Sequence, residues 1–76
     1  MSGAFTVYKT FEQDDVATVV VTDLQGRKLF TREQQVKKGN WTMQLDRSTM
    51  KLVKGIYKIT VYAKHHAPST ESVLVY

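Results

Sequence analysis

Hydrophobic and polar residues alternate along most of this chain with a period of two. The clearest stretches are 41–45 and 56–64, where every second residue is apolar. A period of two places alternate side chains on opposite faces of an extended strand, so both stretches predict β-strands with one buried face. Trp41 and Tyr57 fall in register with the aliphatic positions of their strands, and we therefore expect both in the core.

Four further stretches complete a predicted set of six strands, at residues 4–11, 16–23, 27–36 and 70–76. In the stretch 16–23, Ala17, Val19 and Val21 form the cleaner apolar face, but Val16 and Val20 make the other face partly apolar too. This pattern favours a central strand that is covered on both sides, or one whose outer face meets a partner.

The remaining strands have less regular patterns. We expect Leu29 to anchor the stretch 27–36 in the core, and Phe30 to face outward, as does Tyr62. In the last stretch, Val73 and Val75 are expected to point inward.

Residues 46–54 form the one segment that resembles a helix. Asp46 and Ser48 are the candidate caps of a single turn, which would place Met50 and Leu52 beneath the sheets. The segment is too short to be a stable helix by itself, and Gly55 ends it.

Length and composition agree with an all-β domain. Val, Ile, Thr and the aromatic residues number 29 of 76, against nine Ala and Leu, and such side chains fit a pleated, half-buried surface. Short strands at intervals of about ten residues, joined by polar turns, are typical of an antiparallel β-sandwich or small barrel. We expect residues 1–76 to form one domain with a thin core and no deep active site.

The net charge of +4 is unevenly distributed along the chain. Residues 1–23 carry a charge of −3, whereas residues 24–66 carry ten Lys and Arg against Glu33 and Asp46. A basic middle segment suits phosphate, lipopolysaccharide or an acidic protein surface. The simpler interpretation is a solvated lysine-rich face that keeps sheet edges soluble.

Candidate chemistry is sparse. There is no cysteine, and His65 and His66 are adjacent in a predicted turn without a third metal ligand nearby, so we expect both to be exposed loop histidines. Asp14 and Asp15 lack the spacing of a calcium loop and are interpreted as part of a solvated turn. No nucleophile motif or phosphate-binding loop occurs, so we expect neither enzymatic activity nor a cofactor.

Other classes of protein are also disfavoured. No apolar run approaches the roughly 18 residues of a membrane span, and Met1-Ser2-Gly3 does not resemble a signal peptide, so we expect a cytosolic protein or a piece of a longer exported one. A nucleic-acid platform needs several aromatic residues on one exposed face. Only Phe30 and Tyr62 are predicted to face outward, so we expect no nucleic-acid partner.

Three motifs in order carry a resemblance to a known family. Residues 19–27 fit the hairpin pattern V-x-V-x-D-x-x-G-R, residues 39–45 resemble a G-x-N-x-x-x-L strand shifted by one, and residues 52–61 fit L-x-x-G-x-Y-x-[IV]-x-V. Together, over about residues 16–76, they resemble the C-terminal sorting domain of the type IX secretion system of Bacteroidetes.

The resemblance implies an immunoglobulin-like antiparallel β-sandwich of six to seven strands that serves as an address for an attached cargo. In that family the domain is recognised after export to the periplasm and guides its cargo across the outer membrane to the cell surface or the medium. The implied partners are the translocon and a sortase-like peptidase, which attaches the cargo to anionic lipopolysaccharide. The usual Y-P-N-P opening and K-x-x-V-x-K ending are absent, so a first strand is expected either to be missing or to lie outside this chain, and cleavage of the domain is left open.

The residues divide into structural and recognition candidates. Asp23, Gly26 and Gly55 are expected to shape turns. The candidate recognition residues form the last strand, where a partner strand can add to a free edge: Thr70, Glu71, Ser72, Val73, Leu74, Val75 and Tyr76. The same free edge leads us to expect a concentration-dependent homodimer. The alternatives are a generic immunoglobulin-like adhesion or interaction module and a flagellar hook-capping-like β-domain.

Overall fold

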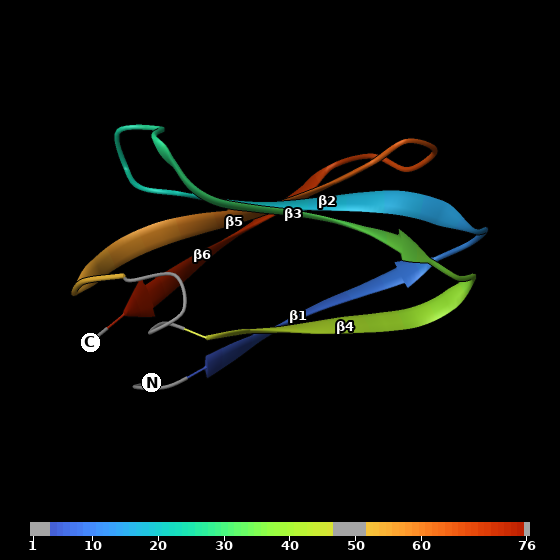
Figure 1. The fold of residues 1–76 in the computed structure, drawn as a ribbon, viewed down its shortest axis with the longest axis horizontal. Helices are drawn as coiled ribbons and strands as arrows, with labels where there is room; N and C mark the ends of the chain where they lie inside the picture. Colours follow the sequence, from blue (N-terminus) through green and yellow to red (C-terminus); the bar gives the residue numbers. More distant parts are fainter. Residues whose placement is uncertain (1–3, 47–51, 76) are drawn as a thin grey trace.

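The computed structural model describes residues 4–46 and 52–75, and these form six β-strands without a helix (Figure 1). The strands are β1 (Ala4–Phe11), β2 (Asp15–Thr22), β3 (Lys28–Val36), β4 (Gly39–Asp46), β5 (Gly55–Ala63) and β6 (Ser69–Val75). Each predicted strand is present, with ends within one residue of those expected except at β4, which starts earlier. Within the segment interpreted as a helical turn, Asp46 ends β4 and Leu52 is buried, whereas Ser48 and Met50 lie outside the described residues.

The strands form two antiparallel sheets that lie face to face (Figure 1). One sheet contains β1 and β4, and the other has the order β3-β2-β5-β6. The chain crosses between the sheets after β1, after β3 and after β4. This order matches strands B and E facing strands C′, C, F and G of an immunoglobulin domain, so the predicted immunoglobulin-like sandwich is confirmed.

The core fills the space between the sheets, and alternation places its residues there. Ala17, Val19 and Val21 of β2 are completely buried, and Trp41 and Tyr57 are 9% and 6% exposed, as predicted. The other core residues are Val7, Phe11, Val36, Met43, Leu45, Leu52, Ile59, Val61 and Val75. Val20 faces away from this core but is only 5% exposed. It lies between Thr31 of β3 and Thr60 of β5, which confirms that β2 is a central strand.

The expectations for Leu29 and Phe30 are wrong. The pairing of β3 with β2 is regular from Val36–Asp15 to Phe30–Val21, so Phe30 lies on the same face as the buried Val21 and packs against the core. Leu29 is instead 41% exposed. Alternation along β3 from the buried Val36 places Phe30 on the inner face and Leu29 on the outer one, and Leu29 is the residue skipped by the register shift between Val21 and Thr22. The outward position of Tyr62 is as predicted, because it is 51% exposed.

A tyrosine fixes the crossing from β4 to β5. The Tyr57 hydroxyl donates a hydrogen bond of 2.6 Å to the carbonyl of Val53, four residues upstream. This is the tyrosine corner of immunoglobulin-like domains, in which a tyrosine near the start of strand F is hydrogen-bonded to the backbone of the preceding loop. Gly55 starts β5 with φ of +156°, and a side chain at this position would meet the Tyr57 ring at 3.7 Å.

Candidate recognition surface

The last strand, β6, lies at one edge of the four-stranded sheet. It pairs with β5 from Gly55–Val75 to Val61–Ser69, and the sheet order leaves its other side without a strand neighbour in the described part of the chain. An edge of this kind presents backbone N–H and C=O groups to a further strand. The predicted recognition residues therefore lie together on one accessible ladder, apart from Tyr76, which falls outside the described residues.

The side chains of β6 divide between the core and the surface. Val75 is buried and Val73 is half-buried against the core, as predicted. Thr70, Ser72 and Leu74 are exposed, with Leu74 opposite Ile56 of β5. The Thr70 and Thr60 hydroxyls are 3.0 Å apart and share a hydrogen bond. Glu71 is opposite the core residue Ile59 and is nevertheless exposed. The strand thus offers a free edge and a largely uncharged outer face.

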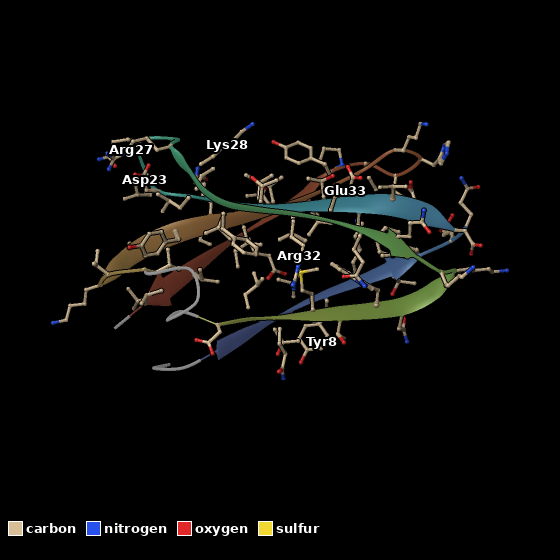
Figure 2. The ribbon with its side chains drawn as sticks, in the orientation of Figure 1. Tyr8, Asp23, Arg27, Lys28, Arg32 and Glu33 are labelled. Carbon is tan, nitrogen blue, oxygen red and sulfur yellow. The ribbon has the colours of Figure 1, made fainter. Side chains whose placement is uncertain are left out.

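The turn between β2 and β3 is organised by Asp23. Its carboxylate accepts hydrogen bonds from the amides of Gln25 at 2.9 Å and Arg27 at 3.0 Å, and from Nε of Arg27 at 2.7 Å. The amide of Gly26, which has φ of +85°, donates to the Asp23 carbonyl at 3.1 Å. The hydrogen bond from the Arg27 amide, with the Arg27 side chain and the Gln25 amide, outweighs desolvation and lowers the pKa of Asp23. Figure 2 shows Asp23 and Arg27 side by side in this turn.

Asp15 is not the solvated turn residue that was expected. Its side chain has no exposed area, and its carboxylate accepts four hydrogen bonds. The donors are the amides of Val16 at 2.7 Å, Lys64 at 3.1 Å and His65 at 2.9 Å, and Nδ1 of His66 at 2.6 Å. Burial alone would raise the pKa of Asp15, but these hydrogen bonds, led by that of His66, hold it far below its ordinary value.

His66 is likewise not an exposed loop histidine, since only 14% of its side chain is exposed. Its Nε2 accepts a hydrogen bond of 3.0 Å from the amide of Glu12, so the ring proton lies on Nδ1 and is directed at Asp15. The ring also packs edge-on against Phe11, with centroids 5.1 Å apart. His65, by contrast, is exposed as expected. A signal for Asp15 was present in the sequence, because it shares the two-residue register of Ala17, Val19 and Val21.

No cluster of three or more candidate metal ligands occurs among residues 4–46 and 52–75. Asp15 and His66, the one close acid–base pair described above, are occupied by backbone amides and by each other. No helix in the described ranges is long and apolar enough to cross a membrane.

Comparison with protein families finds a match to the family described as the secretion system C-terminal sorting domain, over residues 1–75. The match extends beyond the range of the three motifs, 16–76, and includes β1. Comparisons with curated proteins and with solved structures found no match.

Proposed function

Because this chain belongs to the family of secretion system C-terminal sorting domains, we propose that the secretion machinery recognises it mainly through the free edge of β6. A domain of this family is a sorting signal for type IX secretion and marks its protein for export across the outer membrane to the cell surface or extracellular space. The family is not known for enzymatic activity, which supports a role as a sorting signal over a role as an enzyme.

The observation that carries the proposal is the difference between the two edges of the four-stranded sheet. The other edge strand, β3, carries a register shift and the charged residues Lys28, Arg32 and Glu33. Bulges and charged side chains are the usual protection of a sheet edge against further pairing. In β6, Glu71 is the single charged residue. A partner strand therefore meets less resistance at β6, where backbone pairing supplies affinity and alternate side chains supply specificity.

Finer partner assignments follow from the same proposal. We propose that residues 1–76 act as one recognition domain, and that Asp23, Gly26 and Gly55 hold its turns without contacting the machinery. A sortase-like peptidase attaches the cargo to anionic lipopolysaccharide after β6 has been recognised. In isolation, the same edge pairs two copies of the chain into a concentration-dependent dimer, which sedimentation velocity at several concentrations detects.

The test compares edge variants in a full-length cargo fusion. Leu74→Lys places a charge on the exposed face of β6 and leaves Val73 and Val75 in the core. Thr31→Lys is the matched control, because Thr31 is exposed on β3, the opposite edge of the same sheet. We expect Leu74→Lys to abolish surface delivery with the melting temperature of the domain nearly unchanged, and Thr31→Lys to be exported normally.

Deletion of Leu74–Tyr76 is the stronger variant. Loss of delivery with the fold intact supports a recognition strand, and loss of delivery and fold together supports a core role only. Normal export of the cargo fusions that carry the deletion and Leu74→Lys would show that the machinery recognises another surface.

A further inference from the structure

Exposed aliphatic residues gather at one end of the sandwich. Among the described residues, seven large hydrophobic side chains are exposed, and two of them, Tyr8 and Tyr62, are aromatic residues within strands β1 and β5. The other five are aliphatic and lie around the β2–β3 turn and the start of β5: Leu24, Leu29, Val53, Ile56 and Leu74. Leu24 and Val53 are the most exposed of these, at 62% and 71%. Figure 1 shows that the β2–β3 turn and the start of β5 lie at the same end of the molecule.

A shallow groove of about 400 Å³ separates the turn from the start of β5. Leu24 and Leu29, from the β2–β3 turn and β3, and Val53 and Ile56, from the segment that leads into β5 and from its start, line this groove. Contiguous apolar surface of this kind marks an interaction site in a soluble domain more often than scattered single residues do.

The rim of this groove is basic. Arg27 and Lys54 line it and are exposed. Lys28 follows Arg27 in the sequence and is also exposed, and Figure 2 shows it pointing away from the core. Asp23 also lines the groove, but its carboxylate is held by the Arg27 side chain and two backbone amides. We refer to Leu24, Leu29, Val53 and Ile56 together with Arg27, Lys28 and Lys54 as the apolar–basic end. Its outward charge is positive.

The polar groups in the groove wall favour a partner that needs no oriented hydrogen bonds from the domain. The two well-covered polar side chains there are Asp23 and Tyr57, and both already make their hydrogen bonds within the domain. The remaining charges lie on long exposed side chains. A docked peptide usually meets some oriented donors and acceptors, whereas a lipid surface requires only apolar side chains surrounded by cations.

We propose that the apolar–basic end adsorbs to an anionic phospholipid surface. Leu24 and Val53, at the tips of two neighbouring segments, enter the interfacial region. Arg27, Lys28 and Lys54 lie at the level of the lipid phosphates. The contact is peripheral and reversible, and it does not depend on the recognition of β6, because it uses different segments of the chain.

Vesicle co-sedimentation of the 76-residue chain tests this proposal. We expect binding to vesicles of phosphatidylcholine with one-third phosphatidylglycerol, no binding to phosphatidylcholine alone, and loss of binding as NaCl is raised. The double variant Lys28→Gln, Lys54→Gln should partition roughly 25-fold more weakly, since one cation near an anionic surface contributes about fivefold. The control Lys37→Gln, Lys38→Gln removes the same charge from the β3–β4 turn at the opposite end and should change partitioning far less.

A second pair of variants tests the apolar contact. Leu24→Ser with Val53→Ser should weaken partitioning at least about tenfold, since each removes several methylene equivalents from the interface, while the melting temperature stays unchanged because both side chains are exposed. Three results would overturn the proposal: no binding to the anionic vesicles, as expected if an acidic protein is the partner; equal loss with the Lys37 and Lys38 control; or full binding of the serine variant. None of these results bears on export through β6, which the cargo fusions measure separately.

Discussion

The two ends of the sandwich are built in different ways. At the polar end, formed by the β1–β2, β3–β4 and β5–β6 turns, side chains link segments that are distant in sequence. Asp15 and His66 join the first turn to the last, and Asp14 accepts a hydrogen bond of 2.9 Å from the Lys38 amide in the middle one. At the apolar–basic end, the hydrogen bonds of Asp23 and Tyr57 stay within four residues. The polar end thus closes the fold, whereas the other end leaves apolar and basic side chains free for contact.

The core aromatic residues near the two ends give the largest expected effect. Trp41 packs edge-on against Phe11 toward the polar end, with ring centroids 5.8 Å apart, and Tyr57 lies beneath the groove at the other end. We expect Trp41→Ala and Tyr57→Ala each to destabilise the domain by about 3–5 kcal/mol, because both remove a large buried side chain. Urea unfolding measures the loss, and Tyr57→Phe, which removes the hydrogen bond alone, should cost about 1 kcal/mol. If either alanine variant has a melting temperature within a few degrees of the parent, the replaced aromatic residue lies on the surface.

Neighbouring carboxylates at the polar end should differ in their effect on stability. Asp15→Ala leaves three backbone amides and the His66 ring without their acceptor in a covered site, whereas Asp14 has 65% of its side chain exposed. Unmade buried hydrogen bonds are costly and exposed ones are replaced by water. We therefore expect Asp15→Ala to lower the melting temperature much more than Asp14→Ala. Equal melting temperatures would mean that Asp15 does not tie the turns together.

Acid should loosen the polar end before it affects the core. The pKa of Asp15 is far below its ordinary value of 3.8, so its contribution is complete above pH 4 and is lost progressively as the pH falls below that value. The unfolding free energy, followed by urea titration between pH 7 and pH 2, should therefore decrease in acid, and less steeply for Asp15→Asn. Carbon-detected NMR should show Asp15 titrating well below the ordinary range of an aspartate. The same acid slope in parent and variant would assign the loss to other carboxylates.

The smallest effect on stability is expected at the apolar–basic end. Leu24→Ser should change the unfolding free energy by less than about 0.5 kcal/mol, because Leu24 is 62% exposed in the folded domain. A substantially larger loss in thermal or urea unfolding would show that Leu24 packs within the domain, and that the two ends are more alike than their contacts indicate.

The alternation of side chains was sufficient to predict most of the fold. The periodicity of two placed Trp41, Tyr57 and Val19 in the core, because successive side chains of a strand point to opposite faces and every second residue therefore shares one face. The three motifs, read together, also predicted the family, and this is confirmed over residues 1–75. The role of the last strand, by contrast, remains a prediction based on its position and pattern.

Positions that depend on long-range partners could not be predicted in this way. The faces of Leu29 and Phe30 were exchanged because the register of β3, which places Phe30 opposite the buried Val21, is set by pairing with another strand. The burial of Asp15 depends on donors 49 to 51 residues away. For Asp15, the two-residue register that it shares with Ala17 indicated the inner face, but the local pattern does not show whether hydrogen-bond donors meet the carboxylate there.

Sequence alone therefore determined the strands, their inward faces and the family of the domain, because these follow from local periodicity and ordered motifs. Tertiary structure decided which ends of the strands meet, and through this that Asp15 and His66 close one end while Leu24 and Val53 remain exposed at the other. The physical reason is that burial of a polar group depends on partners supplied by the folded chain, whereas burial of an apolar strand face depends mainly on which side of the strand it occupies.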